Sequence, residues 1–120
     1  MIEDYEFEIG IFENILRRNP KDKTVIEALS GIYPRAGRLD DSLKMDRKLV
    51  RLDPDNPTAH YNLACSLALK KRKKDAVAAL SKAIAKGFHD YEWLSKDPDL
   101  NSLREHPEFV ALLKEFKKPE

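Results

Sequence analysis

The sequence predicts an all-α fold built from antiparallel helix pairs. Residues 54–88 show the pattern of two amphipathic helices joined by a short basic turn, and a similar layout begins upstream. Positions that end a helix recur every 34 residues, at Pro20, Pro54 and Phe88. No segment shows a convincing strand pattern. Together these observations indicate a helical repeat protein.

The composition predicts one folded domain over residues 1–120. Hydrophobic residues make up 42% and charged residues 36% of the chain, which is typical of a helical protein with a charged surface. The formal net charge is +1, so the whole molecule has no field that would recruit nucleic acid or an acidic membrane. The single cysteine, Cys65, excludes an internal disulfide. With no signal peptide and no apolar stretch of membrane length, we expect a cytoplasmic location and no membrane span.

Two helices are predicted in the first third of the chain. Apolar residues recur at helical spacing over residues 4–18, and Asn19 followed by Pro20 ends this pattern. Asp22 is a candidate N-cap for the next helix. Because Pro34 lacks the N–H that would continue the backbone hydrogen bonds, we expect a kink or an early end there.

The third and fourth helices are predicted from their start signals. Asp40 or Asp41 is expected to cap the third helix, whose apolar positions continue to Leu52. Asn56 is expected to cap the fourth helix, because Pro57 suits the first helical position.

The fifth helix and the tail complete the predicted elements. The fifth helix is expected to start at Asp75 and to end at Gly87, a candidate left-handed C-cap. In the tail, Asp97-Pro98 and His106-Pro107 are helix-start signals. The last helix has an apolar stripe at helical spacing, formed by Phe109, Leu112, Leu113 and Phe116.

The period and the residue pattern resemble the tetratricopeptide repeat, which is 34 residues long. The second complete unit carries the family's small and large apolar residues at Leu63, Ala64, Leu67, Ala76, Leu80 and Ala83. The unit departs from the pattern at His60, which replaces the usual Trp, and at Lys71, where the turn often has Gly. One unit earlier, Asp46 replaces an aromatic. The resemblance implies a right-handed superhelix of helix pairs.

Residues 89–117 resemble the segment that closes many arrays of this family. The matching motif starts at Asp97-Pro98 and runs to Leu113. Such a cap covers the apolar end of the last repeat, and its expected contacts are Trp93, Leu94, Leu100 and Leu103. The resemblance divides the chain into a second helix of a partial repeat (4–20), repeat 1 (21–54), repeat 2 (55–88) and a helical cap (89–117).

The same resemblance implies that first helices line a concave groove that binds a peptide or a protein surface. Tyr61 and Asn62 are the sharpest candidates, because an aromatic ring and an amide suit an extended peptide. In the alternative interpretation Tyr61 packs on the preceding unit and Asn62 caps local backbone. The positions carried over from the family are Thr24, Glu27, Arg35, Thr58, Tyr61, Asn62, Cys65 and Leu69, with Ala28, Gly31, Pro34 and Ala68.

The function expected from this pattern is that of a non-enzymatic interaction module, an adaptor or assembly factor. The sequence has no Gly-rich phosphate loop and no nucleophile motif, so no catalytic residue and no cofactor are predicted. His60, His89 and His106 lie in different segments without ligand spacing, so no metal site is predicted.

Two alternatives remain open. The basic run of Lys70, Lys71, Arg72, Lys73 and Lys74 could bind an anionic partner, either nucleic acid or a lipid headgroup. A solvated turn is favoured there, because no aromatic residues for base stacking are interleaved, and this disfavours nucleic acid. Separately, the apolar edge of the helix at 4–18 could pair with a second copy of the chain.

Overall fold

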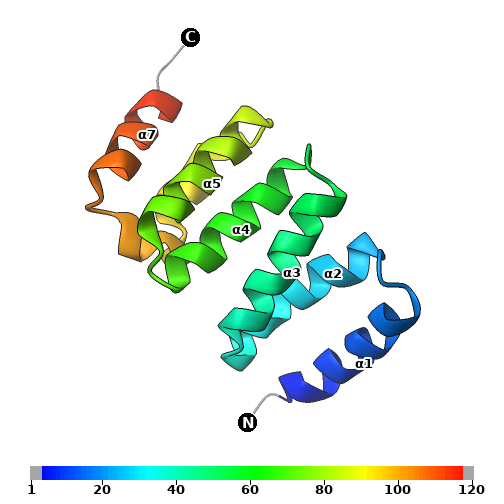
Figure 1. The fold of residues 1–120 in the computed structure, drawn as a ribbon. Coiled ribbons are helices and arrows are strands. Elements are labelled where there is room, and N and C mark those ends of the chain that lie inside the picture. The colour runs from blue at the N-terminus through cyan, green and yellow to red at the C-terminus, as the bar shows by residue number, and fades with distance from the viewer. Residues whose placement is uncertain (1–3, 118–120) are drawn as a thin grey trace.

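The computed structural model describes residues 4–117, and every regular element in that range is helical (Figure 1). The predicted all-α fold is therefore confirmed. In chain order the elements are α1 (Tyr5–Arg18), α2 (Lys23–Ile32), the 3-10 helix η1 (Tyr33–Ala36), α3 (Leu39–Leu52), α4 (Pro57–Leu69), α5 (Lys73–Ala85), α6 (Tyr91–Lys96), the 3-10 helix η2 (Pro98–Leu103) and α7 (Pro107–Lys117).

The helices form a row that runs from α1 at one end to α7 at the other (Figure 1). Short connections fold α2 against α3 and α4 against α5, and the contact between α4 and α5 is the most extensive in the molecule. Each pair also packs on the next, because α3 contacts α4. The result is a solenoid of antiparallel helix pairs.

Side-chain caps fix the starts of α2 and α4 as the sequence predicts. The Asp22 carboxylate accepts a hydrogen bond from the Val25 N–H at 3.2 Å. The Asn56 side-chain oxygen accepts from the Thr58 N–H at 2.9 Å, and Pro57 occupies the first helical position. These bonds satisfy N–H groups that have no partner inside the helix.

The predicted cap of α3 is wrong. The helix begins at Leu39, its N-cap is Arg38, and no side chain makes the capping bond. Asp40 and Asp41 lie in the first turn, where a negative charge still favours the positive end of the helix. Asp41 is instead held by Arg38, whose Nε donates to it at 2.8 Å.

The start of α5 also differs from the prediction. The helix begins at Lys73, so Asp75 lies in its first turn. Two residues before this helix, Lys71 has φ 60°, a left-handed conformation that favours glycine and that explains the glycine often found in this turn. Gly87 follows the helix end with φ 117°, as its predicted role requires.

Two hydrophobic clusters form the core. The first joins α1, α2 and α3, and it includes Ala59 from the start of α4. The second joins α4, α5 and the segment after α5, and it includes Leu43 from α3. Each cluster thus includes a residue from the neighbouring helix pair, so apolar packing joins the pair α2–α3 to the pair α4–α5.

The segment after α5 covers the open side of the second cluster. Leu94, Leu100 and Leu103 are fully buried there, as expected of cap contacts. Trp93 was expected to join them, but its side chain is 49% exposed. The reason is α6, a six-residue helix capped by Asp90 that was not predicted. It points Leu94 into the core, and the neighbouring Trp93 therefore faces a different direction.

Candidate binding groove

The cleft that contains most of the predicted binding residues has a volume of about 680 Å³. One wall comes from the end of α2, η1 and the start of α3, the other wall is α4, and α6 and η2 also contribute lining residues. We call this cleft the groove. Its lining residues are Ser30, Gly31, Pro34, Arg35, Gly37, Leu39, Tyr61, Asn62, Cys65, Ser66, Leu69, Trp93, Asp97 and Asp99.

The structure brings five of the eight principal predicted residues together in the groove, namely Arg35, Tyr61, Asn62, Cys65 and Leu69. The other three, Thr24, Glu27 and Thr58, are exposed on α2 and α4 but do not line it. Of the further positions, Gly31 and Pro34 line the groove, whereas Ala28 and Ala68 do not.

Tyr61 is a buried part of the groove wall. Its ring stacks on the ring of Phe88, with centroids 4.3 Å apart and planes 5° apart. Its hydroxyl donates to Asp97 Oδ2 at 2.5 Å, and burial together with this bond raises the pKa of Tyr61. Tyr61 therefore packs on Phe88 and bonds Asp97, both of which follow it in the chain, and it shares a hydrophobic cluster with Leu43 of the preceding unit.

Asp97 joins the cap segment to α4. Its Oδ1 accepts from the Asp99 N–H at 3.0 Å and so caps η2, as the start signal predicts. Its Oδ2 also accepts a bond from Cys65 Sγ at 3.7 Å, in addition to the bond from Tyr61. Arg104 donates to the Asp97 carbonyl at 2.8 Å. The sequence signal revealed only the first of these roles, because the others join residues farther apart in the chain.

A candidate metal-ligand cluster lies in the groove wall. Three ligand atoms, one each from Cys65, Asp97 and Asp99, lie within 4.8 Å of one another. Burial, followed by the nearby charge of Asp97, raises the pKa of the Cys65 thiol, so a metal would have to displace its proton. Burial and Asp97 also raise the pKa of Asp99. The sequence does not predict this cluster. The cluster contains no histidine, and Cys65 and Asp97 are 32 residues apart, too far for a local sequence motif to include both.

A buried polar network extends inward from the groove wall, which includes Ser30 and Ser66. The hydroxyls of Ser30 on α2 and Ser66 on α4 donate to the two carboxylate oxygens of Asp46 on α3. Ser42 donates to the Ser30 carbonyl at 3.0 Å and contacts the Ser66 hydroxyl at 3.1 Å. Burial raises the pKa of Asp46 to about 7, although the two serine bonds oppose this shift. Three helices are thus joined through one acidic side chain.

The basic run spans the turn after α4 and the first two residues of α5, and none of its residues lines the groove. Lys70 forms an ion pair with Asp40, and its hydrogen bond lowers the pKa of that carboxyl. Lys71, Arg72, Lys73 and Lys74 are exposed. Binding of an anionic partner by this run stays a prediction.

An apolar stripe follows the outer face of α1. Phe7, Ile11 and Ile15 are 67%, 46% and 37% exposed, and their spacing places them on one side of the helix. These are three of the five large apolar side chains that the described residues expose strongly.

Within residues 4–117, no helix is both long enough and apolar enough to cross a membrane.

The sequence has recognisable relatives, although no protein-family model matches it. A chloroplastic protein of Arabidopsis thaliana is 27% identical over 99 residues, which cover 80% of this chain and 29% of that protein. The peroxisomal targeting signal receptor of Saccharomyces cerevisiae is 27% identical over 101 residues, which cover 84% of this chain and 16% of the receptor. The chain therefore spans less than a third of the length of either relative.

The fold also matches a solved structure. The crystal structure of MamA, a protein of the tetratricopeptide type, superposes with a TM-score of 0.76 at 23% identity. The match covers 94% of this chain and 66% of the MamA chain. It therefore includes nearly all the helices described above. The chain has a tetratricopeptide-like helical-repeat fold.

Proposed function

We propose that this chain is a non-enzymatic module that binds an extended peptide or a protein surface in the groove, and that it acts as an adaptor or assembly factor. In this proposal α2 with α3 and α4 with α5 are the two repeats, and the segment from α6 to α7 is their cap. The observation that carries the proposal is the gathering of Arg35, Asn62 and Leu69 at one cleft.

The groove offers three kinds of contact to a peptide. Asn62 provides an amide that both donates and accepts, which suits a peptide backbone. Leu69 and the exposed ring of Trp93 provide apolar surface. Arg35 and Asp99 provide opposite charges that fix the direction of a bound segment. The yeast relative is by its name a receptor for a targeting signal, which supports peptide recognition as the kind of activity.

Replacing Asn62 and Leu69 together with alanine is expected to weaken partner binding about tenfold or more, because both side chains contact the groove and neither anchors the fold. Binding is measured by quantitative capture from native lysate, and then with the purified captured protein by calorimetry. Tyr61 is unsuitable for this test, because its ring and hydroxyl both hold the structure together.

The matched control replaces Thr24 on α2 and Thr58 on α4 with alanine, since both side chains are exposed but lie outside the groove. An unchanged set and amount of captured proteins with the groove variant would refute the assignment of the groove. Equal losses with both variants would do the same.

We also propose that two copies of the chain pair through the apolar stripe on α1. The strong exposure of Phe7 and Ile11 supports this, because pairing would remove that surface from water. Light scattering should show a mass that rises with concentration for the natural protein. The variant Ile11→Lys should remain monomeric at the same concentrations. A natural protein that stays monomeric throughout would contradict the proposal.

The cytoplasmic location also stays a proposal. One of the relatives is a chloroplast protein by name.

A further inference from the structure

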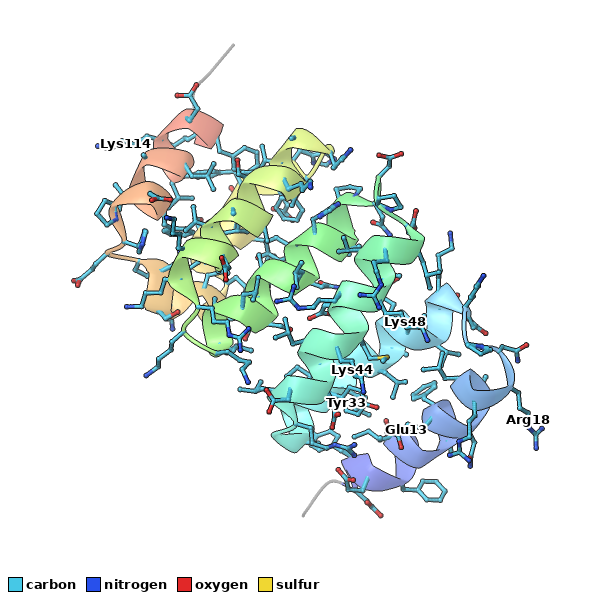
Figure 2. The ribbon with its side chains drawn as sticks, viewed as in Figure 1. Glu13, Arg18, Tyr33, Lys44, Lys48 and Lys114 are labelled. Atoms are coloured by element: carbon cyan, nitrogen blue, oxygen red, sulfur yellow. The ribbon has the colours of Figure 1, made fainter. Side chains whose placement is uncertain are left out.

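A second cleft, of about 610 Å³, lies between α1 and α3 and shares no lining residue with the groove. Figure 2 shows Lys44 and Lys48 on α3, with Tyr33 and Glu13 in the space between α3 and α1. We call it the α1–α3 cleft. Its lining residues are Glu13, Leu16, Arg17, Pro20, Tyr33, Asp41, Lys44, Met45, Lys48 and Arg51.

Four of these lining residues are cations. Lys44, Lys48 and Arg51 follow one face of α3 at spacings of four and three residues, and Arg17 faces them from α1. None of the four forms an ion pair in the part of the chain that the structure describes. Their charges therefore act together on the same cleft.

The two acidic residues of the cleft offset these cations only in part, because both also pair with Arg38. Its Nε donates to Asp41 at 2.8 Å, and its Nη2 donates to Glu13 at 3.5 Å. Glu13 also accepts the hydroxyl of Tyr33 at 2.6 Å. Four cations against two carboxylates leave the lining with an excess of positive charge, so an acidic ligand is attracted to the cleft.

The surface between the charges is apolar. Leu16 and Pro20 contribute from the α1 side and Met45 from α3, where Met45 is buried. The aromatic ring of the cleft, Tyr33, is buried and packs under the Arg38 guanidinium at 4.9 Å. It is therefore not presented for stacking on a base, and the cleft lacks the aromatic platforms of single-strand nucleic-acid sites.

We propose that the α1–α3 cleft binds an acidic segment of a partner protein, in which carboxylates alternate with apolar side chains. The carboxylates pair with the two lysines and two arginines, and the apolar side chains cover Leu16 and Pro20. This site lies outside the groove, so it gives the module a second contact that is independent of the groove ligand.

The test uses a fluorescein-labelled peptide of alternating Glu and Leu as the probe, with anisotropy as the measurement. A matched peptide with Gln in place of Glu and a single-stranded oligothymidine of equal charge are the comparisons. We expect the acidic peptide to bind, with an affinity that falls steeply as salt is added, and the Gln peptide to bind about tenfold more weakly or not at all. Absence of binding by the acidic peptide at low salt, or tighter binding of the oligothymidine, would overturn the proposal.

Two charge-reversal variants test whether the acidic peptide binds in the α1–α3 cleft. Lys44→Glu with Lys48→Glu should weaken binding of the acidic peptide about tenfold or more. Lys73→Glu with Lys74→Glu changes the net charge equally at the start of α5, and it should change binding less than about twofold. Equal losses in both variants would show that only net charge matters and would refute a defined cleft.

Cross-linking gives a readout that does not depend on a variant. A carbodiimide joins a carboxylate of the peptide to a nearby lysine amine in the natural protein, and mass spectrometry identifies the lysine. Cross-links are expected at Lys44 and Lys48. Cross-links confined to the basic run would contradict the proposal.

Discussion

Replacing Phe109 with alanine is expected to lower the free energy of unfolding by about 3–5 kcal/mol, which is the usual cost of emptying a large buried aromatic site. Phe109 is fully buried and packs with Leu100 and Leu103 in the second hydrophobic cluster. The Arg104 guanidinium also lies 5.7 Å from its ring centre. Thermal unfolding followed by circular dichroism should show a melting temperature lower by roughly 10–20 °C.

The control for this prediction is Val110→Ala in the same helix. Val110 is 36% exposed, so its replacement should cost less than about 1 kcal/mol. If both variants lost the same small amount of stability, α7 would not close the core as the structure indicates. Hydrogen exchange adds a local measurement, since loss of the cap contact should speed exchange in α5, the helix against which α7 packs.

The sequence predicted the fold where local chemistry decides the structure. Asp22 and Asn56 cap their helices through bonds to residues two or three positions ahead, so the local sequence is sufficient to predict both helix starts. Pro34 likewise ends α2 in a 3-10 turn. The start of α3 was mispredicted because Asp41 is held by Arg38, and Arg38 is itself positioned by Glu6 and Glu13 on α1.

The groove was predictable in part for the same physical reason. Helical spacing placed Asn62 and Leu69 on a common face of α4, and the family pattern assigned that face to the groove. Asp97 and Tyr61 are 36 residues apart in the sequence, so no local sequence pattern predicts their contact. From the sequence, Asp46 is only a residue that replaces an aromatic in the repeat pattern. Its buried role cannot be predicted, because its hydrogen-bond partners are serines on two other helices.

Asp46 makes the stability of the protein depend on pH. Its carboxyl has an ordinary pKa of 3.8 and a pKa of about 7 in the folded chain, because burial disfavours the charged form. Between these values the folded protein holds a proton that the unfolded chain has lost. The contribution of Asp46 to stability is therefore greatest below about pH 4, falls as the pH rises to about 7, and is constant above that.

The serine bonds to the carboxylate oppose this preference in part, but the hydrogen-bond network can also accommodate the protonated form. When Asp46 is ionised, Ser30 and Ser66 both donate to it, and Ser42 donates to the Ser30 carbonyl. The 3.1 Å contact between Ser42 and Ser66 then has no proton to share. A neutral Asp46 can donate to Ser66, which frees the Ser66 proton for Ser42. Protonation thus completes a chain of bonds through α2, α3 and α4.

Replacing Asp46 with asparagine should therefore stabilise the protein above pH 7, because the amide donates and accepts like the neutral acid but never ionises. Urea unfolding at a series of pH values should show the variant more stable by on the order of 4 kcal/mol at about pH 8 and nearly equal to the natural protein at about pH 4. Asp75→Asn is the control, since Asp75 is exposed on α5 and should leave the pH dependence unchanged. Parallel curves for Asp46→Asn and the natural protein from about pH 4 to about pH 8 would show that Asp46 does not carry a raised pKa in the folded chain.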